Sequence, residues 1–482
     1  MNNNNDQAIR LKKEVLVRLI KAFDSGDFAE NVRIIPYEMR PKGSEVTYRC
    51  CTYKERAILR DRVVASLGFA IDEVEESTSL RDLAKKALKR EAPERNILTV
   101  LDTACKGCTP NRVFVTDLCQ GCVARPCQSI CKFDAIYMQN GKAFIDREKC
   151  KNCKMCIAAC PYNAIVKITV PCEDACPVGA ISKDEGGLAK IDFEMCLNCG
   201  KCIAACPFGA VHEKSQIVDI LRDIKQGKEV IAMLAPSIAG QMPGTMGQLR
   251  SAALKLGFSD VYEVAQGADV TISNEAAEFA ERMDQGQPFM TTSCCAGYRQ
   301  LLNKHIPDLL EFVSDTQTPL YYTAEIVKRL HPQSVTVFVS PCAAKRVEGR
   351  DNPNVDYVIN YKELGAWFVA EHIEILECEE SAFPDFSSVD GKNFGITNGV
   401  ATAVKNALKP EVKLEPCLID GLNKDSIRKL RKFAKDKVCP EGNLVEVMCC
   451  EGGCVGGNGT LNDVKKATQQ ILKIAESLKK QG

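Results

Sequence analysis

The sequence has few histidines, no net charge and no long apolar run. Only four of its 482 residues are His, which leaves little room for a histidine-rich metal site. Its 63 Lys and Arg balance 63 Asp and Glu, so it lacks the charge asymmetry of proteins that bind nucleic acid or anionic membranes. No apolar stretch reaches the roughly 18 residues of a membrane span, and the N-terminus MNNNNDQAIR is unlike a signal peptide. We therefore expect a soluble cytoplasmic protein whose partners include neither nucleic acid nor a membrane.

Cysteine, by contrast, is abundant. The chain contains 27 Cys, and 16 of them fall between residues 105 and 206. In a reducing cytosol such residues are thiols or metal ligands rather than disulfides. No nucleotide-binding glycine motif is evident, so direct use of NAD is not expected.

Composition divides the chain into three regions. Residues 1–98 are rich in Lys, Arg, Glu and Leu and contain helix-like stretches such as LRDLAKKALKR. Residues 99–212 hold the dense cysteines, and residues 213–482 alternate β-rich apolar runs with helical patterns. That alternation predicts an α/β domain with a largely parallel sheet, so the expected fold is multidomain, combining α+β and α/β regions. Cys50 and Cys51 match no cluster motif and are assigned no function.

Two segments of the cysteine-rich region share one metal-binding pattern. CKNCKMCIAACP (150–161) and CLNCGKCIAACP (196–207) both match C-x2-C-x2-C-x3-C-P. In two-cluster ferredoxins, the first three cysteines bind one 4Fe-4S cluster and the fourth reaches over to its neighbour. A structural zinc site would need four ligands and no such crossing, so the pattern indicates iron-sulfur clusters.

An internal repeat supplies the remaining ligands. CKFDAIYMQNGKAFIDREKC and CPVGAISKDEGGLAKIDFEMC share a Cys, an Ala-Ile, an Ile-Asp and a closing Cys, which predicts tandem ferredoxin-like modules. The leftover ACKGC segment completes a fourth set, although three clusters plus free thiols remain an alternative. The predicted first to fourth sets are Cys119, Cys122, Cys127 and Cys160; Cys131, Cys150, Cys153 and Cys156; Cys176, Cys196, Cys199 and Cys202; and Cys105, Cys108, Cys172 and Cys206.

Three further groups of thiols each follow an apolar, β-rich run. They lie in TTSCCAGY (291–298), SPCAAKR (340–346) and EVMCCEGGC (446–454). Ligands of an open α/β sheet bind at the carboxyl ends of its parallel strands, so these thiols are expected to converge on one metal site. Cys378, Cys417 and Cys439, as well as Cys449, are instead expected to be small buried apolar side chains.

These three segments resemble the active-site motifs of the iron-only, or [FeFe], hydrogenases, which run approximately TSCCPxW, MPCxxKxxE and ExMxCxxGC. Together with the ferredoxin modules, the resemblance covers roughly residues 100–460. It implies a C-terminal α/β catalytic domain that carries an H-cluster, a 4Fe-4S cluster bridged to a diiron unit with CO, cyanide and azadithiolate. By this resemblance Cys295, Cys342, Cys450 and Cys454 would be its ligands, and dedicated maturation proteins would insert the diiron unit.

The resemblance also implies a proton path and a set of cofactor contacts. Cys294 would be the proton donor, since an exposed, polarised thiol suits proton relay. Glu275, Glu278, Arg282 and Ser314 would continue the path, although their helical spacing alone suggests a solvated, salt-bridged face. Cofactor contacts would come from Ala235, Pro236, Ser237, Lys345, Glu348 and Met448. We expect Gly452 and Gly453 to let the backbone turn against the inorganic core.

Four positions depart from the family's usual residues. Ala296 and Tyr298 replace Pro and Trp in the first motif, Ser340 replaces Met in the second, and Leu320 replaces a Gln that usually contacts cyanide. These changes resemble the group B members of the family. They alter the polarity around the diiron unit, which affects rate and bias rather than reaction class.

The sequence therefore predicts a hydrogenase that interconverts protons and H2. At least three, and by our count four, accessory 4Fe-4S clusters would exchange electrons with ferredoxin or a similar one-electron carrier. The alternatives are a hydrogen sensor or low-activity regulatory hydrogenase, a hydrogenase-like iron-sulfur assembly protein, and a plain electron-transfer protein. The intact proton path and the three strand-end thiol groups count against them.

Overall fold

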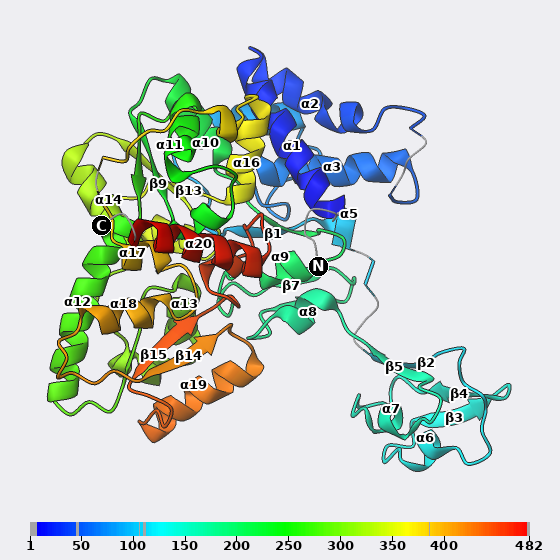
Figure 1. The fold of residues 1–482 in the computed structure, drawn as a ribbon. Coiled ribbons are helices and arrows are strands. Elements are labelled where there is room, and N and C mark those ends of the chain that lie inside the picture. Colours follow the sequence, from blue (N-terminus) through cyan, green and yellow to red (C-terminus); the bar gives the residue numbers. More distant parts are fainter. Residues whose placement is uncertain (1–6, 45–47, 106, 109–111, 385, 480–482) are drawn as a thin grey trace.

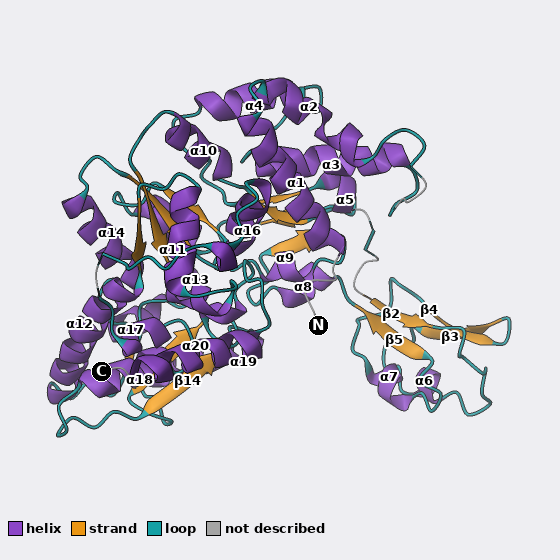
Figure 2. Ribbon diagram, turned by 45° about the horizontal axis from the view of Figure 1, so that its top comes forward, coloured by secondary structure: helices purple, strands orange, loops and turns teal. Residues whose placement is uncertain are grey.

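A computed structural model describes residues 7–44, 48–105, 107–108, 112–384 and 386–479 (Figure 1). No helix within these ranges is both long and apolar enough to cross a membrane. Helices and strands alternate along most of the chain, and a small module projects from the main body (Figures 1 and 2).

The N-terminal region consists of four helices. Two of them begin at an acidic or hydroxyl cap: Asp27 accepts the N–H of Glu30, and Ser79 accepts that of Asp82. Their apolar faces do not enclose a separate core, because Leu16 belongs to the same buried cluster as Trp367 of the C-terminal region. The helices are α1 (Gln7–Asp24), α2 (Phe28–Met39), α3 (Thr52–Ser66) and α4 (Leu80–Lys89).

The cysteine-rich region begins and ends in a pair of antiparallel strands. β1 (Leu98–Val100) pairs with β8 (Val211–Glu213), so the ends of this region lie side by side. The sequence-based borders at residues 98 and 212 fall inside these strands. Between them the short strands form three antiparallel pairs, β2 with β5, β3 with β4 and β6 with β7.

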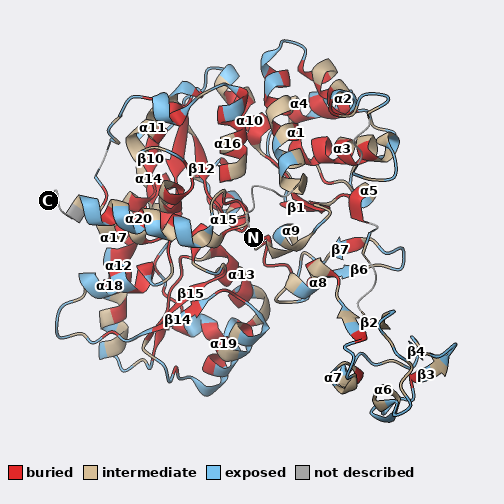
Figure 3. Cartoon of the chain, turned by 45° about the vertical axis from the view of Figure 1, so that its right-hand side comes forward, coloured by how far each residue is buried: buried red, intermediate tan, exposed pale blue. Residues whose placement is uncertain are grey.

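The region contains two modules of similar size. The first module projects from the main body in all three ribbon views (Figures 1, 2 and 3). Its elements are β2 (Arg112–Val115), α6 (Pro126–Ser129), β3 (Ile136–Gln139), β4 (Lys142–Ile145), α7 (Met155–Ala159) and β5 (Ile165–Ile168). The second module, beside α5 (Asp102–Cys105), contains α8 (Pro171–Ala175), β6 (Ile181–Lys183), β7 (Ala189–Ile191) and α9 (Lys201–Ala205).

The C-terminal region is an α/β structure whose strand pairs are all parallel, as expected, but they form two sheets instead of one. One sheet has the order β10-β9-β12-β13, and the other has the order β11-β15-β14. The strands are β9 (Val230–Leu234), β10 (Asp260–Glu263), β11 (Met290–Thr291), β12 (Val335–Val339), β13 (Tyr357–Ile359), β14 (Pro416–Asp420) and β15 (Leu444–Met448).

Helices cover both sheets, and the strands between them are largely buried (Figure 3). β9 and β15 are buried along their whole length, which explains their continuous apolar character. The helices are α10 (Ile217–Lys225), α11 (Met246–Lys255), α12 (Ala265–Asp284), α13 (Ala296–His305), α14 (Pro319–Leu330), α15 (Lys345–Asp351), α16 (Tyr361–Ala370), α17 (Val389–Asn393), α18 (Gly399–Ala407), α19 (Lys424–Asp436) and α20 (Val464–Lys479), with short 3-10 helices η2 (Pro236–Gly240), η3 (Pro307–Phe312), η4 (Ile375–Glu377) and η5 (Cys454–Gly456).

Candidate metal centre

The structure brings the predicted thiols of the first three sets together. Each set lines one small cavity: the first lies beneath α6, the second beside α7 and the third beside α9. No three His, Cys, Asp or Glu side chains in the described ranges converge closely enough to hold a single metal ion. Four thiols around a shared space fit the ligand set of a 4Fe-4S cluster.

One loop geometry recurs at four of the predicted cluster thiols, in all four sets. The Sγ atoms of Cys131, Cys160, Cys176 and Cys206 each accept the backbone N–H of an Ala four residues later, at 3.2–3.4 Å. The residue before each Ala has a positive φ, which turns that N–H back toward the sulfur. N–H donors of this kind stabilise negatively charged sulfur and fit cluster-bound thiolates.

The fourth set also comes together. The charges of Cys206, Cys105 and Cys108 all act on Cys172, and burial, the largest effect, raises its pKa to about 11. The Sγ of Cys105 accepts hydrogen bonds of 3.2 Å from Ala189 N and Lys183 Nζ. Crowded, buried thiols do not readily ionise on their own, whereas metal ligation deprotonates them.

Replacing Cys172 with serine should therefore remove one cluster, or about four iron atoms per chain. Iron analysis and electron paramagnetic resonance of the purified holoprotein would measure the loss. Cys50→Ser is the matched control, because Cys50 is exposed and lies outside all four sets. Unchanged iron content in Cys172→Ser would favour the alternative of three accessory clusters.

In the C-terminal region, the two sheets together supply four partly buried thiols to one site. Cys295 follows β11, Cys342 follows β12, and Cys450 and Cys454 follow β15. Burial raises the pKa of Cys342, and the charges of the other three thiols raise it further. The expected convergence is thus present, but it occurs where two sheets meet rather than along one edge.

Gly452 and Gly453 shape the loop after β15. Both have φ near +82°, a conformation that suits glycine. A Cβ on Gly452 would come within 2.3 Å of Val464 Cγ1, and one on Gly453 within 2.9 Å of Gly395 O. These glycines therefore allow close packing against protein, and their expected approach to the inorganic core stays a prediction.

Cys294 lies beside this thiol group and is 8% exposed, so the expectation of an exposed thiol was wrong. Burial raises its pKa, and the nearby Glu275 carboxyl raises it further. Glu275 is itself fully buried; the Ser293 backbone N–H and the Ser314 hydroxyl both lower the pKa of its carboxyl, but neither makes a hydrogen bond of ordinary geometry to it in the described chain. Burial, followed by the charge of Glu278, raises the pKa of Glu275 to about 8.

Glu278 connects this buried pair to the surface. Its Oε2 accepts the hydroxyl of Ser314 at 2.6 Å, and its Oε1 pairs with Arg282 Nη2 at 2.7 Å. Arg282 also pairs at 2.9 Å with Asp315, whose side chain is 94% exposed. Glu278 and Arg282 on α12 thus form the expected salt bridge, while Glu275 on the same helix is buried in the core.

The predicted cofactor contacts surround the same site. Lys345 Nζ lies 3.3 Å from the carbonyl oxygen of Cys294 and 2.6 Å from Glu348 Oε2. Burial opposes the charge of Lys345, but Glu348 outweighs it and raises the pKa. Ser237, which follows Ala235 and Pro236 after β9, shares a 2.7 Å hydrogen bond with Tyr361. Met448 is buried at the end of β15.

The unusual motif residues are accommodated inside the core. The Tyr298 hydroxyl is 2.9 Å from Thr291 Oγ1, so this buried polar group is satisfied. Ser340 Oγ accepts the backbone N–H of Cys342 at 3.4 Å, and Leu320 is 1% exposed. The substituted side chains therefore fit the fold without leaving a polar group unpaired.

Cys449 has a more specific position than the buried filler expected from sequence. Its thiol hydrogen-bonds Cys199 of the third set and Cys450, which raises the pKa of Cys449 and lowers the pKa of each neighbour. Its backbone N–H donates to Cys295 Sγ at 3.4 Å. A Cβ on Gly297 would lie 2.9 Å from the Cys449 sulfur. Cys449 thus lies between two predicted cluster sites. The only sequence signal for this position is that Cys449 directly precedes the predicted ligand Cys450.

Three segments of the chain match models of known protein domains. Residues 228–458 match the model of the iron only hydrogenase large subunit, C-terminal domain, and residues 110–169 and 171–210 match 4Fe-4S dicluster domains. Iron hydrogenase 1 of Clostridium pasteurianum is 28% identical over 312 residues, covering 51% of this chain and 54% of that protein. The chain spans little more than half the length of the first curated relatives it matches.

Two further similarities are more distant. An [FeFe]-hydrogenase structure aligns with 54% of this chain and 88% of its own at 20% identity and a TM-score of 0.44. Cytosolic Fe-S cluster assembly factor NAR1 of Kluyveromyces lactis is 22% identical over 302 residues, covering 47% of this chain and 63% of that protein. Residues 228–458 therefore match an iron-only hydrogenase C-terminal domain, and they follow two segments that match 4Fe-4S dicluster domains.

Proposed function

We propose that this chain is a hydrogenase that interconverts two protons and two electrons with one molecule of H2. One observation carries the proposal: four thiols converge on a site beside Cys294 and Glu275, and Glu278 connects this pair with the surface. A purely structural cluster would need the thiols but not a fully buried carboxyl with a raised pKa.

Cys295, Cys342, Cys450 and Cys454 would hold the H-cluster, with Cys454 also reaching the diiron unit. When bound, this group supplies the redox and hydrogen-forming chemistry. The residues around the site fit a buried anionic group, because Lys345 brings a positive charge and Ser237 brings a hydroxyl. Burial also keeps bulk water away from the site.

Protons would travel between Glu278 and Cys294. Glu278 exchanges protons near the surface, where its partners are Arg282 and Ser314. Glu275 is the inner carrier, because its raised pKa of about 8 allows it to bind and release a proton near neutral pH. Cys294 then presents the proton to the reaction site, and Lys345 restrains its backbone.

Electrons would travel through the accessory clusters. The projecting module holds the first two ligand sets, which makes it a suitable contact for ferredoxin or another one-electron carrier (Figure 1). Clusters held by these sets would supply electron transfer, and Cys449 lies between the third set and the candidate H-cluster site because it contacts both Cys199 and Cys450. We also propose that the protein acts in the cytoplasm. Its candidate H-cluster site would resemble that of the group B hydrogenases.

Infrared spectroscopy of protein produced together with the hydrogenase maturation proteins tests the proposal. CO and cyanide stretching bands should appear, and the preparation should consume or produce H2 with a one-electron dye. An assembly protein would show iron-sulfur signals without those bands. A hydrogen sensor would show the bands with very slow turnover, so the two measurements separate all three functions.

A further inference from the structure

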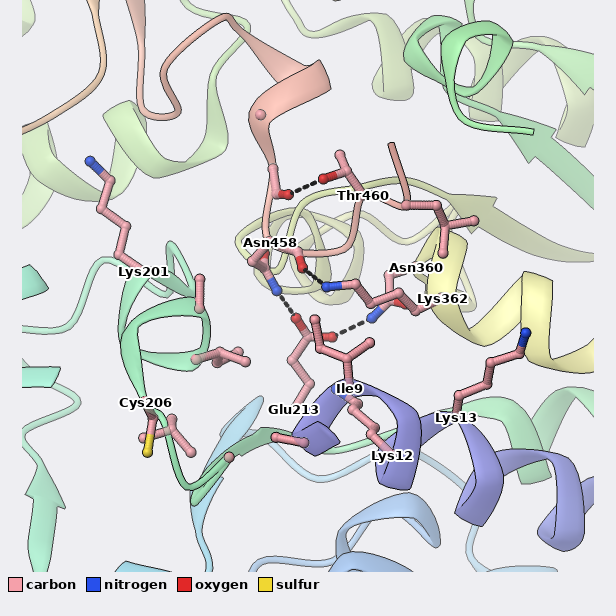
Figure 4. A pocket seen from close by; sticks show the side chains of 18 of the residues that line it. Ile9, Lys12, Lys13, Lys201, Cys206, Glu213, Asn360, Lys362, Asn458 and Thr460 are labelled. Atoms are coloured by element: carbon pink, nitrogen blue, oxygen red, sulfur yellow. Dashed lines mark hydrogen bonds between the residues drawn. The ribbon is translucent and has the colours of Figure 1, made fainter. Parts of the chain in front are cut away.

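A large cavity is lined by α1, the second cluster-bearing module and the loop that follows β15. Its volume is about 900 Å3, within the range of small-molecule sites. Figure 4 shows α1 on one side, with Glu213, Asn360, Lys362 and Asn458 meeting across the middle. Cys199, Cys206 and Cys450 contribute to the wall, but the remaining ligands of their sets do not. The cavity is therefore distinct from the predicted cluster sites.

The cavity wall carries an excess of positive charge. Seven basic residues line it against three acidic ones, although the whole chain has no net charge. Positive charge focused in a concave site attracts anions more strongly than the same charges on an open surface. The basic residues are Arg10, Lys12, Lys13, Arg62, Lys201, Lys362 and Lys466, and the acidic ones are Glu213, Glu451 and Asp463.

A buried polar atom in the wall lacks a partner. His212 is 2% exposed, and its Nδ1 lies 2.9 Å from the Glu213 carbonyl oxygen. Its Nε2 has no hydrogen-bond partner within the described chain, although the side chain lines the cavity. Leaving a buried ring nitrogen unpaired is costly, so this atom indicates a missing contact.

The polar groups in the middle of the cavity are held in place. Asn360 Nδ2 and Asn458 Nδ2 both donate to the Glu213 carboxylate, and Lys362 Nζ donates to Asn458 O at 2.6 Å. Burial opposes the charge of Glu213, but Lys12 and Arg346 outweigh it and lower its pKa. A fixed polar floor of this kind supports binding without rearrangement.

We propose that this cavity binds a small organic anion that carries at least two phosphate or carboxylate groups. The excess of four basic residues favours several negative charges. Ile9, Leu16, Ile203 and Leu461 provide an apolar wall for the organic part. The site does not require hydrogenase activity, so it would exist in protein that lacks the diiron unit.

Binding should also alter the accessory clusters, a consequence that rests on the proposed cluster assignment. A bound anion would lie near Cys199 and Cys206, which belong to the third and fourth sets. Negative charge near a cluster disfavours the addition of an electron. Occupation of the cavity should therefore shift the midpoint potentials of these clusters to more negative values.

Calorimetric titration of the anaerobic iron-sulfur holoprotein tests the site. Pyrophosphate, ADP and citrate are the probes, and they distinguish phosphate, phosphate with an organic body, and carboxylate. At least one should bind with one-to-one saturation, and Lys12→Gln/Lys13→Gln should weaken binding about tenfold or more. Lys466→Gln, a change on α20, should weaken it independently. Lys85→Gln/Lys86→Gln, two exposed changes on α4, is the matched control and should bind normally.

Absence of saturable binding by all three probes would overturn the proposal. So would equal affinity in the wild type and the two cavity variants. A redox titration followed by electron paramagnetic resonance, with and without the binding probe, tests the second part. A negative shift of the cluster midpoint potentials that disappears in Lys12→Gln/Lys13→Gln would support electrostatic control of the clusters by the bound anion. Binding without any shift would reject this control but not the binding site.

Discussion

Replacing Cys294 with alanine should lower hydrogen turnover at least about a hundredfold and leave the metal centre intact. Cys294 lies next to the predicted ligand Cys295, and the Glu275 carboxyl has the largest effect among the charges that act on its thiol. The substitution should therefore remove the proposed last proton carrier without removing a predicted metal ligand. Dye-linked H2 assays should show the loss, while infrared spectra of the matured protein should retain CO and cyanide bands.

Cys378→Ala is the matched control for this experiment. Cys378 is also a buried thiol, but it contacts Lys255, away from the candidate centre. Its replacement should leave both turnover and spectra unchanged. Near-normal turnover by Cys294→Ala would remove Cys294 from the proton route, and loss of the infrared bands would instead assign it a role in holding the cofactor.

Replacing Glu275 with glutamine should slow turnover about a hundredfold or more, because the amide cannot pass on a proton. Glutamine has nearly the same volume, so the buried site should remain filled. Glu281→Gln is the control on the same helix, since Glu281 is exposed and bonds Gln285. If both variants turned over equally, protons would have to reach Cys294 by another route.

Glu275→Gln should also change how stability depends on pH. The pKa of Glu275 rises from a reference of 4.5 to about 8 in the folded chain, mainly because of burial. Between these values the folded state keeps a proton that the unfolded state has released. The free energy of unfolding contributed by this group therefore falls as pH rises through that window. Denaturant unfolding at pH 6 and pH 9 should show a smaller pH difference for Glu275→Gln than for the wild type.

The cluster ligands could be predicted from sequence because their spacing is local. Cys150, Cys153 and Cys156 lie within seven residues, and one turn of chain brings them around a common space. The internal repeat aligns Cys131 with Cys176, so the same pattern of cluster ligands is predicted for the second module. The α/β character of the C-terminal region was predictable for a similar reason, since its buried strands are continuous apolar runs.

Contacts between distant parts of the chain could not be predicted from the sequence. Sequence periodicity does not specify strand order, so the separation of β11, β14 and β15 into their own sheet could not be foreseen. The position of Cys449 depends on Cys199, 250 residues earlier, and on the space left by Gly297. The burial of Cys294 and Glu275 likewise depends on elements far apart in the chain.

The core shared by the N-terminal helices and the four-stranded sheet makes them a cooperative unit. Leu16 and Leu19 of α1 lie in the same buried cluster as Leu364 and Trp367 of α16. The projecting module has its own small cluster, which includes Val113. Removal of the N-terminal helices would therefore expose apolar surface on the catalytic region, whereas the projecting module can lose its structure in a separate transition.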